Sequence, residues 1–151
     1  MKKLSKIVAI IAAMTVVFCF TSASFAASGD ICKSACIKEG RTASFNIKTK
    51  GSSPSITVTK SKGQVKVDGV GKYASKYQIY NMYLTDLNTK KTTVTYYWAS
   101  QSKNTHKLTG LKKNTKYRLS IYAAGFGASG IPDVWKSTPR VTVDPHNAAF
   151  Y

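Results

Sequence analysis

The chain carries two histidines, His106 and His146, among 23 basic and only six acidic residues. Two histidines and a lysine could serve a small ribonuclease, because phosphodiester cleavage needs a proton acceptor, a proton donor and a cation for the phosphate. His106 is expected at an exposed strand start and His146 near the end of the chain. A small basic secreted nuclease is therefore kept only as a second alternative function.

No other group of residues has the spacing of a catalytic or metal-binding motif. The six acidic residues do not pair as glycosidase carboxylates do. The segment "GASG" at 127–130 lacks the G-x-S-x-G of a nucleophile elbow, and "DGVGK" at 68–72 lacks the spacing of a phosphate-binding loop. The sequence therefore predicts a non-catalytic protein with no cofactor and no metal.

Lysine dominates the charge, because 20 of the 23 basic residues are lysines. An ammonium is a hydrated point charge, which favours diffuse attraction to polyanions over shaped recognition. One cluster lies on successive predicted strands and their turns, and a second surrounds the stretch 108–117. Their members are Lys48, Lys50, Lys60, Lys62 and Lys66 in the first, and Lys103, Lys107, Lys112, Lys113 and Lys116 in the second.

These lysines predict a polyanion partner. Residues 27–151 carry 20 basic and six acidic residues, a net charge of +14, whereas solubility needs a magnitude of about 2 to 8. The expected partners are teichoic acid, an acidic polysaccharide or extracellular DNA. The alternative is that the lysines only keep the protein soluble and protect the sheet edges.

Aromatic residues are frequent between residues 73 and 98, and a further tryptophan lies in a Gly/Pro-rich loop. Exposed rings could stack on sugars, and two-sided core packing is the alternative, because aromatic residues favour strands. The candidate sugar-stacking residues are Tyr80, Tyr83, Tyr97, Trp98 and Trp135.

Two cysteines, Cys32 and Cys36, form the motif "CKSAC". An oxidising compartment favours a disulfide between them. A zinc site is the alternative, but it would need more ligands than the two separate histidines supply. The predicted disulfide would close only a short local loop.

The first 26 residues are typical of a secretory signal. Three lysines precede the apolar run Ile7–Phe20, and Ser24-Phe25-Ala26 provides small residues for cleavage. Fourteen apolar residues are too few for a bilayer core, which needs roughly 20. We expect cleavage after Ala26, a mature chain without a transmembrane segment, and an extracellular or wall-associated location.

The remaining chain shows the period-two alternation of half-buried strands. Apolar residues alternate with polar ones in the segments 43–48, 55–60, 64–68, 93–98, 117–123 and 140–144. Segment 76–87 is apolar on both faces, as expected of a central strand, and "KSKG" at 60–63 predicts a hairpin turn. The pattern predicts an all-β protein, a single antiparallel sandwich of about seven to eight strands.

One domain is expected. The predicted boundaries are a signal peptide at 1–26, a lead-in with the cysteine pair at 27–41, the sandwich at 42–144 and a loose tail at 145–151.

The stretch 105–143 resembles a fibronectin type III domain. Leu108 and Leu111 match its Leu-x-x-Leu turn, and Thr115 and Tyr117 match the Thr-x-Tyr that begins the next strand. The resemblance implies an immunoglobulin-like sandwich in which the Tyr117 hydroxyl bonds to the backbone upstream. The early half of the chain fits this family less well, and a jelly-roll-like sandwich has the same alternation.

The sequence thus predicts a secreted bacterial β-sandwich that binds anionic surface, wall or matrix polymers. Because such sandwiches carry many activities, this function is argued from the charge alone. A secreted antimicrobial or toxin-like antagonist of other bacteria is the first alternative.

Overall fold

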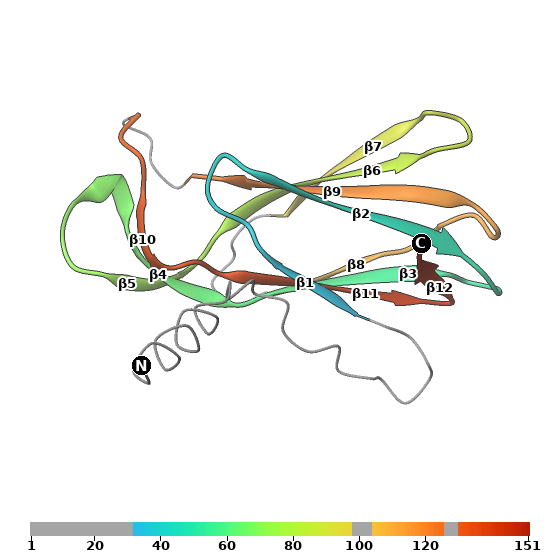
Figure 1. The fold of residues 1–151 in the computed structure, drawn as a ribbon, viewed down its shortest axis with the longest axis horizontal. Coiled ribbons are helices and arrows are strands. Elements are labelled where there is room, and N and C mark those ends of the chain that lie inside the picture. Colours follow the sequence, from blue (N-terminus) through green and yellow to red (C-terminus); the bar gives the residue numbers. More distant parts are fainter. Residues whose placement is uncertain (1–31, 98–103, 126–129) are drawn as a thin grey trace, which may run out of the picture.

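The computed structural model describes residues 32–97, 104–125 and 130–151, which are almost entirely antiparallel β-structure (Figure 1). These residues form twelve strands and one short 3-10 turn. The all-β prediction is confirmed, although seven or eight strands were expected. The predicted signal segment lies outside the described residues. Within them, no helix has the length and apolarity needed to cross a bilayer.

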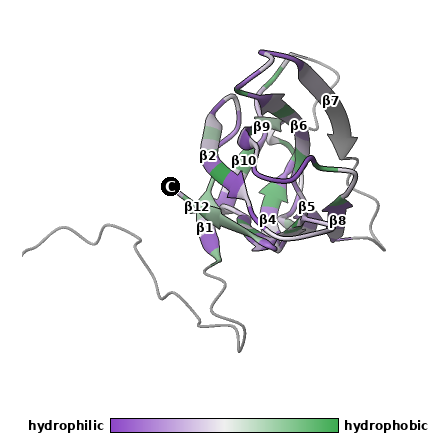
Figure 2. Ribbon diagram, turned by 90° about the vertical axis from the view of Figure 1, so that its right-hand side faces the viewer, coloured by the Kyte–Doolittle hydropathy of each residue, from purple (hydrophilic) through white to green (hydrophobic). Residues whose placement is uncertain are grey.

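Two sheets stack face to face (Figure 1). In spatial order, the first contains β1 (Lys33–Cys36), β11 (Arg140–His146), β3 (Ser55–Lys60) and β8 (Thr105–Leu108). The second contains β12 (Ala148–Phe150), β2 (Thr42–Thr49), β9 (Lys116–Ala124), β6 (Ile79–Asp86) and β7 (Thr92–Tyr97). Figure 2 looks down the long axis of the molecule and shows the strands surrounding a common interior.

A third sheet joins the two layers at one end, at the left of Figure 1. It contains β10 (Val134–Ser137), β4 (Lys62–Lys66) and β5 (Ala74–Tyr77), with the 3-10 turn Val67–Gly69 after β4. β3 continues into β4 with only Ser61 between them, and β5 continues into β6 with only Gln78 between them. The predicted hairpin turn at 60–63 is therefore wrong, because the chain bends there and does not reverse.

Gly63 permits this third sheet to form. A Cβ at this position would lie 2.3 Å from the Ser137 carbonyl oxygen and 2.7 Å from the Trp135 ring. Such distances are shorter than van der Waals contact, so any larger residue would push β10 away from β4. The glycine in "KSKG" thus marks a close backbone approach.

The period-two alternation correctly predicted which side chains of the main strands form the core. The inward residues of the main strands are almost fully buried: Phe45, Ile47, Ile56, Val58, Val65, Tyr117, Leu119, Ile121, Ala123, Val141 and Val143. Val67 is the exception. It was expected to face inward with Val65, but β4 ends at Lys66 and Val67 begins the exposed 3-10 turn.

The last residues form a strand and not a loose tail. Asn147 has a left-handed φ of 48° and turns the chain tightly from β11 into β12, which pairs with β2. Phe150 then packs on Phe45, with ring centroids 6.3 Å apart. The apolar residues in "DPHNAAFY" therefore add an edge to the second sheet.

The predicted Cys32–Cys36 disulfide is not formed. Cys36 ends β1, and Cys32 immediately precedes that strand. Four residues of extended chain span about 13 Å, whereas a disulfide requires Cα atoms less than about 7 Å apart. The strand pairing of β1 with β11 is what separates the two thiols.

Lys60 is buried in the corner where β3 becomes β4, with only 1% of its surface exposed. Its ammonium donates a hydrogen bond to the Gln78 carbonyl oxygen at 3.2 Å and lies 5.3 Å from the centroid of the Tyr77 ring. Burial lowers the pKa of this lysine to about 8. The prediction that Lys60 contacts a polyanion is therefore wrong, because its side chain points into the protein.

This burial predicts a pH-dependent stability. The folded pKa lies below the unfolded value of about 10.4, so the unfolded state binds more protons between these values and stability rises with pH. Relative to Lys60→Met, the wild-type free energy of unfolding should rise by about 2 kcal/mol from pH 8 to pH 10. Urea titrations measure this, with the exposed neighbour Lys62→Met as control. Parallel pH profiles for wild type and Lys60→Met would contradict it.

The close approach at Gly63 generates a second prediction. Gly63→Ala should lower the free energy of unfolding by about 1–3 kcal/mol, because the methyl group overpacks a backbone contact. Gly51→Ala is the matched control, since a Cβ there meets the Asn147 side chain only at 3.4 Å or more. Equal stability of the two variants in urea would show that β10 can move aside.

Candidate polyanion-binding end of the sandwich

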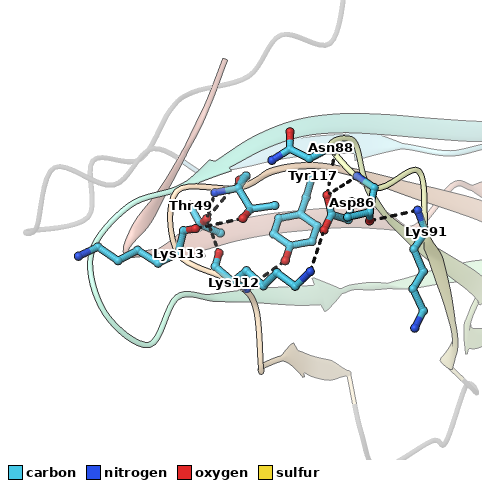
Figure 3. A network of polar contacts seen from close by, with 9 residues as sticks. Thr49, Asp86, Asn88, Lys91, Lys112, Lys113 and Tyr117 are labelled. Atoms are coloured by element: carbon cyan, nitrogen blue, oxygen red, sulfur yellow. Dashed lines mark hydrogen bonds and ion pairs between the residues drawn. The ribbon is translucent and has the colours of Figure 1, made fainter.

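Asp86 organises the end of the molecule opposite the third sheet (Figure 3). It ends β6, and its Oδ1 accepts hydrogen bonds from the backbone N–H groups of Asn88 at 2.9 Å and Thr89 at 3.2 Å. The Lys112 ammonium lies 3.5 Å from Oδ2. The carboxylate thus closes the β6–β7 turn and ties it to the loop 109–115, where Lys112 lies.

The surroundings of Asp86 favour its charged form. Burial raises the pKa of the carboxyl, but the hydrogen bonds from Thr89 and Asn88 and the charge of Lys112 outweigh this effect. The net pKa therefore lies below the ordinary value. At neutral pH the group is an anion that fixes the loop.

Two further contacts fix the loop 109–115. The Lys112 backbone N–H donates to the Tyr117 hydroxyl at 3.0 Å, which confirms the predicted bond from this tyrosine to the backbone upstream. On the other side, the buried Thr49 hydroxyl donates to the Lys112 carbonyl at 2.6 Å and accepts from the Thr115 N–H at 2.8 Å. Figure 3 shows both contacts on either side of Lys112.

These contacts bring together lysines from both predicted clusters. Lys48 and Lys116 are direct cross-strand neighbours of β2 and β9. Thr49, between Lys48 and Lys50, bonds the loop that carries Lys112 and Lys113. We call this group the lysine-rich end, and its members are Lys48, Lys50, Lys107, Lys112, Lys113 and Lys116.

The lysine-rich end has little internal neutralisation. All six side chains are exposed. Asp86 contacts Lys112, and the Lys116 ammonium lies 5.2 Å from the Tyr151 ring centroid. Within the described ranges, no carboxylate lies within ion-pair distance of Lys48, Lys50, Lys107 or Lys113. Like charges held this close create a positive potential that attracts anions.

A cleft of about 430 Å³ opens beside these lysines. Leu84, Leu108 and Leu111 supply apolar lining, and Lys91, Lys107 and Lys112 supply cations. The Asp86 carboxylate also lines this cleft and contacts Lys112. Leu108 and Tyr117 are buried and Leu111 packs on the core, as expected of the Leu-x-x-Leu turn.

The other predicted lysines lie elsewhere. Lys62 and Lys66 belong to β4 in the third sheet, and Lys60 is the buried lysine of the corner. Lys103 lies outside the described residues. The sequence did not reveal that the ammonium groups of the two β4 lysines lie over tyrosine rings. The Lys62 ammonium lies 5.3 Å from the Tyr77 ring centroid, and the Lys66 ammonium lies 4.8 Å from that of Tyr73.

The predicted sugar-stacking aromatics do not gather into one platform. Tyr80 is 1% exposed, so its assignment to sugar stacking is wrong: β6 directs this ring into the core. Tyr83 lies half-buried on the outer face of β6. Trp98 and the side chain of Tyr97 lie outside the described part of the structure. Trp135 lines a separate cleft of about 540 Å³, beside Lys38 and Glu39.

The two histidines do not meet. His106 pairs with Val58 on one side of β3, and His146 pairs with Ser55 on its other side. Two strand spacings and three residues of β-strand place them about 14 Å apart. Burial lowers the pKa of His106, whereas His146 Nε2 lies 3.4 Å from Asp144. An acid–base pair requires hydrogen-bond reach to one substrate, so this arrangement gives the nuclease alternative no support.

No family model, curated protein or solved structure matches the chain. Any function is therefore argued from the arrangement of its own residues.

The Asp86 contacts predict a loss of stability in Asp86→Asn that depends on pH. A depressed carboxyl pKa stabilises the fold above about pH 4, and this contribution disappears as pH falls through the folded pKa. The melting temperature of Asp86→Asn should fall below that of wild type at pH 7 and approach it at pH 3. Asp144→Asn, at a more exposed carboxylate, is the control. An equal deficit at both pH values would contradict the electrostatic role.

Proposed function

We propose that the protein binds an anionic polymer of a cell surface, wall or matrix, without catalysis, through the lysine-rich end. The observation that carries this proposal is the convergence of six exposed lysines from β2 and the residue after it, β8, β9 and the loop 109–115. Asp86, Thr49 and Tyr117 fix the loop that carries Lys112 and Lys113, so the backbone positions of these two lysines are set before a ligand arrives.

The chemistry favours a polymer over a small anion. Each exposed ammonium attracts a phosphate or carboxylate weakly, because solvent and salt screen it. A polymer with one charge per repeating unit contacts several lysines at once, and the weak contacts then act together. Teichoic acid, acidic polysaccharide and extracellular DNA share this property. The scarcity of arginine supports recognition of charge density and not of sequence.

The predicted secretory signal at 1–26 supports the same proposal. Export would bring a cationic protein to the outside of the cell, where wall and matrix polymers carry negative charge. The proposed location is therefore extracellular or associated with the wall.

Removal of two central lysines should weaken binding and reduce its salt dependence. Lys48→Gln/Lys116→Gln removes a cross-strand pair of charges from the lysine-rich end. The slope of log affinity against log salt concentration should fall by about 1.5, by analogy with counterion release from nucleic acids. Co-sedimentation with intact walls and with walls stripped of teichoic acid measures this between about 50 and 200 mM salt.

The matched control is Lys72→Gln/Lys136→Gln, which removes the same charge from the opposite end. It should retain the wild-type slope if the lysine-rich end is the contact surface. Equal losses in both double variants would indicate that net charge alone drives binding. No binding of the wild-type protein to either wall preparation would overturn the proposal.

A further inference from the structure

The exposed apolar residues gather at the end opposite the lysine-rich end. Six large apolar side chains of the described ranges are exposed; four of them lie on the connections that flank the third sheet, and a fifth begins its strand β10. They are Val67 at 37%, Val70 at 69%, Tyr73 at 40%, Ile131 at 53% and Val134 at 45%. The sixth is Tyr151, the last residue of the chain, which lies beside Lys116 at the lysine-rich end. We call the five residues the apolar tip.

Two chain segments distant in sequence build this tip. Val134 pairs with Lys66 across β10 and β4, and the Asp68 N–H donates to the Asp133 carboxylate at 3.0 Å. A Cβ on Gly69 would lie 3.6 Å from Val134 and 3.8 Å from Ile131. Val67 and Val70 at the 3-10 turn, Ile131 before β10 and Val134 at its start therefore form one exposed patch beside the third sheet.

Lysines surround the apolar tip. Lys66 and Lys136 place their ammonium groups 4.8 and 5.7 Å from the centroid of the Tyr73 ring, and Lys72 is the neighbouring residue. The nearby acidic residues are Asp68, Asp133 and Glu39; Asp133 is buried and accepts a hydrogen bond from the Asp68 N–H, and its charge acts on Glu39. The third sheet also carries Lys62 and Lys76, and Lys38 lines a cleft with Glu39 and Asp133, so lysines outnumber acidic residues in this part of the molecule.

We propose that the apolar tip docks on an anionic lipid bilayer. Valine and isoleucine side chains would enter the boundary between headgroups and acyl chains, where burial of apolar surface and attraction to anionic lipids add together. Tyr73 is an aromatic residue suited to the headgroup level, and the lysines around it match phosphate groups.

The composition of the tip favours a bilayer over a protein partner. Protein hot spots are rich in tryptophan, tyrosine and arginine that fill pockets of the partner. The apolar tip is mainly aliphatic, projects outward and is surrounded by lysines and not arginines. This inference is independent of the proposed function, because it concerns different residues at the other end of the molecule.

The test compares binding to vesicles of equal phosphatidylglycerol and phosphatidylcholine with binding to phosphatidylcholine alone. It uses the protein without residues 1–26, because the apolar run Ile7–Phe20 would itself enter lipid. All described strands lie after residue 32 and are retained. The wild-type protein should sediment with the anionic vesicles, and Val70→Asp/Ile131→Asp should bind at least tenfold more weakly.

The matched control is Ser52→Asp/Tyr151→Asp, which adds the same charge at exposed positions away from the apolar tip. It should bind anionic vesicles as the wild type does. Lys72→Gln/Lys136→Gln should lose about fivefold for each lysine. Lys48→Gln/Lys116→Gln should weaken wall binding but keep vesicle binding. Wall binding and vesicle binding therefore test the proposed function and the bilayer proposal separately.

A direct measurement of insertion guards against a folding defect in the aspartate variant. The tryptophan fluorescence of Val70→Trp should be quenched by brominated lipid in anionic vesicles. Absence of wild-type vesicle binding, equal loss in the Ser52/Tyr151 control, or no quenching would overturn the proposal. A change in sedimentation coefficient of the aspartate variant without any vesicle effect would assign the tip to self-association and would also overturn it.

Discussion

The fold depends on the corner where β3 becomes β4 and β5 becomes β6. There the buried Lys60 ammonium donates to the Gln78 carbonyl, and the Gln78 side-chain amide donates to the Ala124 carbonyl at the end of β9. A buried polar group is costly unless it is hydrogen-bonded, so these two bonds favour the arrangement in which β3, β5 and β9 meet at the corner. The corner thereby sets how both large sheets continue into the third sheet.

The one-residue connections between β3 and β4 and between β5 and β6 also determine how the two ends of the protein are joined. The lysine-rich end and the apolar tip lie at opposite ends of the long axis, with these strand pairs running between them (Figure 1). No hinge-like linker separates them within the described ranges. If both proposals hold, one rigid body would contact a polymer at one end and lipid at the other. The lysines at one end would then contact the polymer and those at the other end the lipid, so their positions and not the total charge would determine the partner.

The alternation of residues predicted which faces are buried, because the side-chain period of a strand leaves no other choice. Lys60 was predicted as a surface lysine from its residue type, although it shares the strand face of Ile56 and Val58 and is buried with them. The bend at Ser61 was unpredictable, since a hairpin and a continuous strand share the same pattern. The Tyr117 turn formed as expected. In immunoglobulin-like domains the last strand lies beside the tyrosine-corner strand, whereas here β2 and β6 flank β9.

The position of β11 has a consequence for the order of folding. β11 lies between β1 and β3, and β12 completes the opposite sheet, so residues 140–150 contribute to both layers. The first sheet has no central partner for β1 until this segment is available. Long-range pairing of this kind is slow to form. Both layers of the sandwich would therefore be complete only once residues 140–150 have joined them.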